Sequence, residues 1–174
     1  MATTADESFD VQDDDLDEDD APAQDAVSLL SADHAEVKQM FENYRQLVEE
    51  NADDEQRGEL ARNICAELGV HAEIEEEIFY PSMRESIDAD LILDEAEVEH
   101  AAAKDLIEQI EDMDPGDALF DAKVLVLGEY IDHHVQEEET EIFPLAEKSG
   151  LDLDELGAEL ASRKRELMAT LADE

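Results

Sequence analysis

Two stretches of eleven residues decide the fold of this chain. From His71 to Pro81 the sequence reads HAEIEEEIFYP, and from His134 to Pro144 it reads HVQEEETEIFP. Each begins with histidine, carries glutamate four residues later and ends in proline ten residues after the histidine. Residues four apart lie on the same face of an α-helix, about 6 Å apart along its axis. The spacing therefore predicts two helices that each present a His-x-x-x-Glu pair.

The helical pattern extends outward from these stretches over most of the chain. Apolar residues recur every three or four positions, and strand-like alternation is absent from the sequence. Pro81 is expected to end or kink its helix, and Pro115, in an Asp-Pro-Gly turn, is expected at the first position of the fourth helix. The expected helices cover Asp25–Glu50, Asp53–Tyr80, Asp90–Met113, a segment from the turn to about Lys148, and Asp154–Leu171. Short connections between long amphipathic helices predict an all-α, antiparallel four-helix bundle.

The chain divides into three parts. Residues 1–24 hold ten acidic residues, no basic residue and few apolar ones, so this tail is predicted to be disordered. Residues 25–150 form the predicted bundle. Residues 151–174 contain the extra C-terminal helix, which is expected to pack on or beside the bundle.

Charge excludes several classes of partner. The chain has 53 Asp and Glu against 11 Lys and Arg, which gives a net charge of −42. Such a charge would be repelled by nucleic acid and by anionic membranes. The acidic residues are spread over the domain, which favours adaptation to the salt-rich cytoplasm of a halophile. The lone Cys65 and the lack of a signal-peptide or membrane-spanning pattern also favour a cytoplasmic protein.

Four of the five histidines interrupt apolar stripes, one on each of the four long helices. One such histidine is usually a hydrogen-bonded core residue, but four that face one interior need a shared partner, and a metal supplies it. Two glutamates in register with histidines can bridge two ions. Nitrogen and oxygen donors with vacant positions suit non-haem iron better than zinc, manganese or cobalt. The predicted dinuclear site consists of His34, His71, Glu75, His100, His134 and Glu138.

The sequence leaves the roles of three further residues undecided. Glu97, one turn before His100, is an additional ligand or a surface residue. Tyr130, one turn before His134, is a hydrogen-bond donor behind the ligands, a redox residue or core filling. His133 has the same spacing to Glu137 as His134 has to Glu138, but the distance to the following proline favours the second pair, so His133 is expected on the flank of the helix.

The ordered set of histidines and glutamates resembles the hemerythrin-like cation-binding (HHE) domain. The IFYP and IFP endings, the phrases SADH and VEH around the single histidines, and the segment LDLDELGAELASRKREL are similar to that family too, so the resemblance covers about residues 25–171. It implies a four-helix bundle with a di-iron centre that meets O₂, peroxide or nitric oxide. Two departures stand out. Lys104 occupies the position of a further histidine in oxygen carriers, and the carriers' last carboxylate lies five residues after its histidine, which leaves Glu139 as an alternative to Glu138.

Three functions are compatible with this resemblance. The first is a di-iron protein that binds or senses O₂, peroxide or nitric oxide, or that gives redox protection against them. The second is an enzyme with catalase-like or nitric-oxide-metabolising turnover. The third, a ferritin-like iron oxidase or store, ranks last because that class needs two Glu-x-x-His motifs and the chain has one, from Glu97 to His100. The sequence identifies no protein partner.

Overall fold

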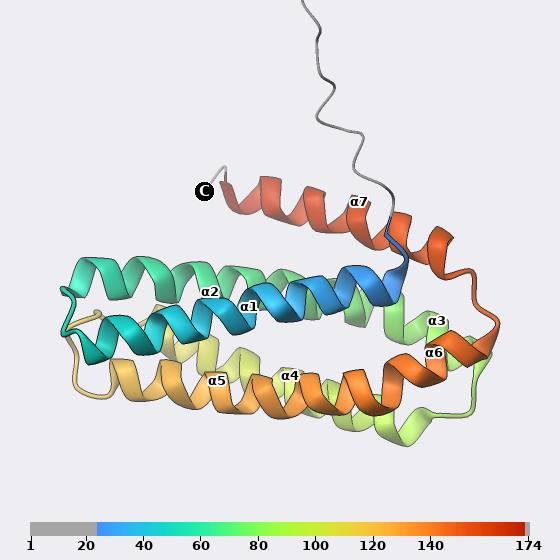
Figure 1. The fold of residues 1–174 in the computed structure, drawn as a ribbon, viewed down its shortest axis with the longest axis horizontal. Coiled ribbons are helices and arrows are strands. Elements are labelled where there is room, and N and C mark those ends of the chain that lie inside the picture. Colours follow the sequence, from blue (N-terminus) through green and yellow to red (C-terminus); the bar gives the residue numbers. More distant parts are fainter. Residues whose placement is uncertain (1–23, 173–174) are drawn as a thin grey trace, which may run out of the picture.

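The computed structural model describes residues 24–172, and this part of the chain is an antiparallel bundle of four long helices with a fifth helix outside it (Figure 1). The fold therefore confirms the all-α bundle with an extra C-terminal helix. Of the predicted disordered tail, residues 1–24, all but Gln24 lies outside the described residues. No helix among the described residues is long and apolar enough to cross a membrane. The elements in order are α1 (Ala26–Glu49), α2 (Asp54–Ile74), the π-helical turn η1 (Glu75–Phe79), α3 (Tyr80–Ser86), α4 (Asp90–Glu111), α5 (Phe120–Glu137), the π-helical turn η2 (Glu138–Ile142), α6 (Phe143–Ser149) and α7 (Leu153–Ala172).

Aspartate side chains start the first two helices. Asp25 precedes α1 in an extended conformation, and its carboxylate accepts the backbone N–H of Ser28 at 3.0 Å. Asp53 accepts the N–H of Gln56 at 2.9 Å in the same way. Each bond satisfies a donor that the first helical turn leaves without a partner. Sequence and structure therefore agree on where these helices begin.

The second and fourth bundle helices each contain a π-turn, and each π-turn starts at the glutamate of the His-x-x-x-Glu pair. The N–H of Tyr80 bonds to the carbonyl of Glu75, and the N–H of Phe143 bonds to the carbonyl of Glu138. A proline follows each turn, and it cannot donate the next bond of the π-type ladder. The second helix nevertheless continues to Ser86. Of the two expectations for Pro81, an end of the helix near Tyr80 is wrong, because the chain stays helical through the π-turn and the proline.

The fourth helix begins later than its proline suggested. Pro115 lies in a turn and packs against Gly58 of α2, where an added Cβ would overlap the proline ring. Helix α5 starts only at Phe120, after Leu119 in a left-handed conformation with φ 77°. Leu119 is 68% exposed and does not belong to the buried apolar face of the fourth helix. Contact with α2 holds Pro115 at the end of the bundle, so the chain needs several more residues to enter α5.

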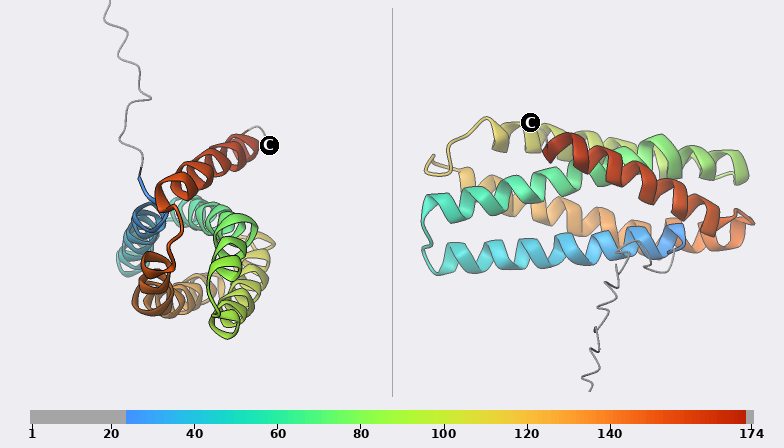
Figure 2. Two further views of the ribbon diagram at one scale, coloured as in Figure 1. Left: turned by 90° about the vertical axis from the view of Figure 1, so that its right-hand side faces the viewer. Right: turned by 90° about the horizontal axis from the view of Figure 1, so that it is seen from above.

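Apolar side chains form two clusters, one on each side of a buried polar layer. One cluster joins α1, the end of α2, both π-turns, α3, α4, α6 and α7, and the other joins α1, α2, α4 and α5 toward the α1–α2 connection. Helix α7 lies outside the four-helix bundle and packs across α1 and α2 (Figure 2). Leu156 and Leu160 are its buried anchors. Gly157 sits so close to the start of α1 that a side chain there would strike the backbone of Gln24 and Asp25.

Candidate metal centre

The polar layer between the two clusters contains six buried side chains from the four bundle helices. Helices α1, α2, α4 and α5 contribute one histidine each, and the π-turns η1 and η2 contribute one glutamate each. Both glutamates have no exposed surface. These six are the residues that the sequence selected: His34, His71, Glu75, His100, His134 and Glu138.

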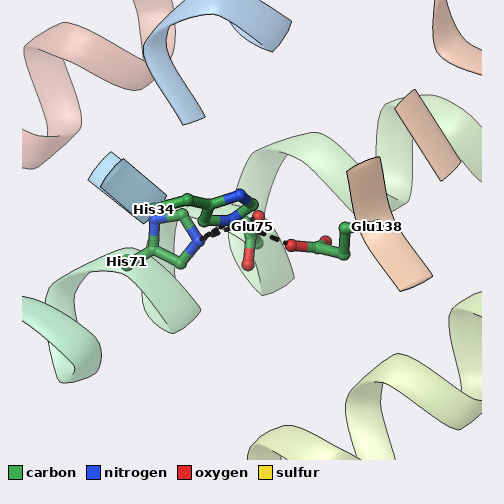
Figure 3. Close-up of side chains that lie close together, drawn as sticks. All are labelled: His34, His71, Glu75 and Glu138. Atoms are coloured by element: carbon green, nitrogen blue, oxygen red, sulfur yellow. Dashed lines mark hydrogen bonds and ion pairs between the residues drawn. The ribbon is translucent and has the colours of Figure 1, made fainter. Parts of the chain in front are cut away.

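The histidines meet as two pairs through their Nε2 atoms. His34 and His71 approach to 3.1 Å, and His100 and His134 approach to 3.0 Å. Figure 3 shows the first pair pointing toward the carboxylates of both π-turns. These donors form two groups that could each hold an ion: His34, His71, Glu75 and Glu138, and separately Glu75, His100 and His134.

The two glutamates lie between the histidine pairs. Glu75 places Oε1 3.2 Å from Nε2 of His71 and Oε2 3.3 Å from Nε2 of His100. Glu138 places Oε2 3.2 Å from Nε2 of His34 and 3.4 Å from Nε2 of His134. Each carboxylate therefore reaches one histidine of each pair, which is the arrangement that a bridging ligand needs.

On the side away from this centre, every histidine of the layer has a carboxylate at Nδ1. The pairs are His71 with Asp33 at 3.4 Å, His34 with Glu139 at 3.2 Å, His100 with Glu76 at 3.0 Å and His134 with Glu99 at 2.8 Å. A carboxylate accepts the Nδ1 proton and so fixes the tautomer in which Nε2 carries a lone pair. All four lone pairs then point into the centre.

This donor set fits cations better than it fits a metal-free core. Two facing Nε2 lone pairs about 3 Å apart repel each other unless positive charge lies between them. Metal–nitrogen bonds of about 2.1 Å at right angles would separate the nitrogens by about 3.0 Å. In addition, Glu75 Oε1 and Glu138 Oε2 are buried without a hydrogen-bond partner in the structure, which is costly unless an ion compensates.

The pKa values of the buried His71 and Glu75 also indicate that positive charge stabilises this layer. Burial alone would lower the pKa of His71, but the charge of Glu75 and the hydrogen bond with Asp33 raise it to about 10. Burial would raise the pKa of Glu75, yet the neighbouring His71 and His100 hold it well below its usual range. In the metal-free chain, protons on His71 and His100, whose pKa values are both raised, thus supply charge that bound cations would provide.

Tyr80 is a member of the site that sequence reasoning missed. Its buried hydroxyl donates to Glu138 Oε1 at 2.8 Å and lies 3.4 Å from Nε2 of His100. Burial and the carboxylates of Glu75 and Glu138 raise the pKa of Tyr80 well above its ordinary value, so the phenol stays neutral. In a regular α-helix, Tyr80 would point about 140° away from Glu75. The π-turn brings the ring back over the centre, and the tyrosine before the proline was the only signal in the sequence.

Two of the open candidates lie outside the centre. Glu97 is half-exposed and accepts from Arg84 at 2.9 Å, so it does not join the donors as an additional ligand. Tyr130 is 53% exposed and faces away from the buried layer, where it was expected to point inward. The side chain of Ile131, one residue later, takes the inward position beside the histidines instead.

The positions of the remaining candidates follow from the helix faces on which they lie. Glu138 lies in the centre, whereas Glu139 is partly exposed and holds the outer nitrogen of His34. His133 is 65% exposed, as its expected place on the flank requires. Lys104 donates from Nζ to both oxygens of Glu76, at 2.8 and 2.7 Å, and therefore supports the carboxylate behind His100.

A small cavity adjoins the donors. It has a volume of about 30 Å³, and all four inward histidines line it together with apolar side chains and Lys104. A water-sized site needs about 10–15 Å³ by the same kind of measure. The space therefore admits a molecule of two or three heavy atoms and excludes larger substrates.

Comparison with known proteins agrees with the helical fold and places the chain in a family. The sequence model of the hemerythrin HHE cation-binding domain matches residues 25–146, and the chain belongs to that family. The crystal structure of a hemerythrin HHE cation-binding domain-containing protein from Mycobacterium kansasii is similar, with a TM-score of 0.71 and 20% sequence identity over 84% of this chain and 89% of that one. A search of curated protein sequences gave no match.

Proposed function

We propose that this protein binds two iron ions in the buried layer and reacts there with O₂, peroxide or nitric oxide. His34 and His71 would hold one ion, His100 and His134 the other, and the two glutamates would bridge them. The observation that carries the proposal is the pair of Nε2–Nε2 approaches at 3.1 and 3.0 Å, with every outer nitrogen fixed by a carboxylate. Nitrogen-rich and carboxylate ligands with vacant positions suit iron.

The size and polarity of the cavity support a small ligand. A bound iron pair supplies redox equivalents and open coordination positions. The chain supplies a small, mostly apolar space of about 30 Å³ beside the histidines, which suits a small ligand. Tyr80 adds a neutral hydroxyl that donates to Glu138 and orients this carboxylate.

Turnover of peroxide is the second candidate, and Lys104 favours it. Its side chain lines the small cavity beside His100, while its ammonium group pairs with both oxygens of Glu76. Lys104 stands where oxygen carriers have an additional histidine, and its paired ammonium group adds no metal donor there. With fewer strong donors near His100, we expect the reduced protein to be oxidised by O₂ without releasing it again.

The first experiment counts ions. Protein purified anaerobically in high salt should contain two iron ions per chain, measured by elemental analysis together with protein concentration. His134→Ala should lower the occupancy and the thermal stability, because bound metal stabilises only the folded state. His133→Ala should retain both buried ions once it is fully loaded. One ion or none in reconstituted wild-type protein would refute the dinuclear centre.

The second experiment separates the two candidate functions. The reduced protein is mixed with O₂, hydrogen peroxide or nitric oxide, and its absorption spectrum and the ligand concentration are followed by stopped flow. Catalytic loss of peroxide identifies the enzyme, whereas a stable spectral change without turnover identifies the binding protein. Full return of the reduced spectrum after O₂ is removed under vacuum, over repeated cycles, would contradict irreversible oxidation and indicate oxygen carriage.

A further inference from the structure

A second group of potential metal donors lies on the surface beside the buried centre. His133 and Glu137 stand on α5, and Glu99 stands on the neighbouring α4. Nε2 of His133 is 3.4 Å from Oε1 of Glu137 and 3.7 Å from Oε1 of Glu99. One donor atom from each of the three residues lies within 4.8 Å of the others. The His-x-x-x-Glu spacing of the buried pair is thus repeated one residue earlier on the exposed flank of the same helix.

Glu99 connects this surface group to the buried centre. Its Oε2 accepts from Nδ1 of His134 at 2.8 Å, and its Oε1 faces His133. One carboxylate therefore stands between an exposed imidazole and an imidazole whose other nitrogen points at the centre. Glu99 differs in this respect from Asp33 and Glu76, whose carboxylates pair with lysines.

A surface pocket of about 470 Å³ opens at the same place. It is lined by Glu99 and His133 of the surface group, by the buried His100 and His134, by the exposed Tyr130, and by the apolar Ala102, Ala103 and Ile131. None of its lining residues is lysine or arginine. The pocket therefore leads from the surface group to two of the inner histidines without passing a fixed positive charge.

The pocket on the other side of α5 provides a contrast. It reaches His34 between α1 and α5, and its lining contains Lys38 and Arg45, which pair with Asp132 and Glu42. The charges of this lining therefore balance, whereas the pocket beside His133 carries the carboxylate of Glu99 and no lysine or arginine, which attracts a cation. Of these two routes to the inner histidines, the one beside His133 is thus the one suited to a cation.

We propose that His133, Glu137 and Glu99 form a surface site for a divalent cation, and that this site delivers ions to the buried centre. Ligand atoms around a tetrahedral ion with bonds of about 2.1 Å are about 3.4 Å apart, close to the separations observed here. An ion held there also lies against the carboxylate that bonds His134. The site stands by itself, whereas its delivery role rests on the proposed function of the buried centre.

Binding is tested first with Co²⁺, whose absorption spectrum reports its ligands. A His71→Ala/His100→Ala chain, which has lost inner donors of both pairs, should bind one Co²⁺ ion in molar KCl, which screens non-specific attraction to the acidic surface. Adding His133→Ala to this chain should weaken binding by about tenfold or more. Adding Asp132→Asn, an exposed acidic neighbour on α5, should not change it. Equal binding with and without His133 would overturn the site.

A full-length chain with intact inner donors provides the second measurement of binding and avoids any loss of fold in the double variant. With the inner centre saturated by Zn²⁺, equilibrium dialysis should find one more ion in wild-type protein than in His133→Ala. Equal numbers would overturn the site. If the inner centre itself takes up no metal, the proposed function fails, while the Co²⁺ result in the double variant still decides the surface site.

Delivery is tested by the rate of loading. The metal-free full chain is mixed with Co²⁺ in stopped flow, and the signal of the inner centre is followed to completion. Glu137→Gln should slow this phase by about tenfold, whereas Asp132→Asn, which removes the same charge, should leave it unchanged. Both variants should reach the wild-type final spectrum. Identical rates in Glu137→Gln and wild type would overturn the delivery role.

Discussion

At the residue scale, the centre depends on hydrogen bonds that fix which nitrogen faces inward. An imidazole offers either nitrogen to a metal, and the outer carboxylate makes the choice. Tyr80 does the same for Glu138, because its hydroxyl occupies Oε1 and leaves Oε2 toward the histidines. The geometry of the donors is therefore set before any ion binds.

We predict that Tyr80→Phe weakens metal binding without preventing folding. The ring remains to fill the core, but Glu138 loses its buried hydrogen bond and becomes less well oriented. Loss of such an outer partner lowers metal affinity by about 10- to 100-fold. Competition with a chelator, followed by absorption, measures this change. Tyr130→Phe, at an exposed tyrosine, is the matched control, and equal affinities in the two variants would contradict the assigned role of Tyr80.

A second residue-scale prediction concerns pH. Burial and the hydrogen bond to Asp121 raise the pKa of Tyr44, whose hydroxyl donates at 2.8 Å. The unfolded tyrosine ionises near pH 10, so the folded state loses stability as the pH rises above about 10. Tyr44→Phe should cost about 1 kcal/mol at neutral pH and make the alkaline loss shallower. Denaturant unfolding at several pH values measures both, and an unchanged alkaline slope would argue against this linkage.

At the element scale, the π-turns and α7 adapt a regular bundle to its centre. Each π-turn starts at an inward glutamate, and the first of them returns Tyr80 to the interior. Helix α7 contributes to the centre from outside. Lys164 donates from Nζ to Oδ1 of Asp33 at 2.8 Å, while Oδ2 of Asp33 faces Nδ1 of His71 at 3.4 Å.

We therefore predict that Lys164→Gln affects one metal position more than the other. Asp33 would lose its cationic partner and orient His71 less firmly, so affinity at the position of His34 and His71 should fall by about tenfold. The position of His100 and His134 should be unaffected. Stepwise metal titration in the absorption spectrum resolves the two.

Lys148→Gln removes the same charge from an exposed position on α6 and serves as the control for Lys164→Gln. It should leave both affinities at the wild-type value. Equal weakening of the two positions in Lys164→Gln would indicate a general loss of charge or packing in place of a link through Asp33.

At the scale of the whole molecule, charge is the dominant feature. A net charge of −42 on 174 residues makes the compact state repel itself. The described ion pairs offset this only locally, because cations are few: Arg163, for example, is shared among Glu73, Glu77 and Glu166. Screening by salt acts on the remaining repulsion everywhere at once.

We predict that salt stabilises the fold strongly. Between about 0.1 M and 1 M salt the Debye length falls from about 10 Å to about 3 Å, so repulsion between neighbouring carboxylates is largely removed. The thermal unfolding midpoint of the metal-free chain should rise over this range of KCl and level off above it. Sucrose, which stabilises without screening charge, is the control. A midpoint that is constant or falls with KCl would contradict a repulsion-limited fold.

The sequence by itself determined the helices and the faces that they bury. Both depend on local spacing, and four-residue separation places His71 with Glu75, and His134 with Glu138, whatever surrounds them. The distance from Glu138 to the following proline predicted His133 on the flank. Helix caps such as Asp25 are also local, so the helix starts could be read directly.

Only the tertiary structure decided which groups surround the donors. Glu97 has the right spacing to His100, but Arg84 from another helix holds it at the surface. Tyr80 has the wrong spacing for a regular helix, and the π-turn brings it in. Each of the four outer carboxylates lies on a different helix from its histidine, as with Glu76 behind His100. Such contacts depend on how the helices pack and on which of several partners a flexible side chain pairs with. Neither is encoded in the periodicity of one helix.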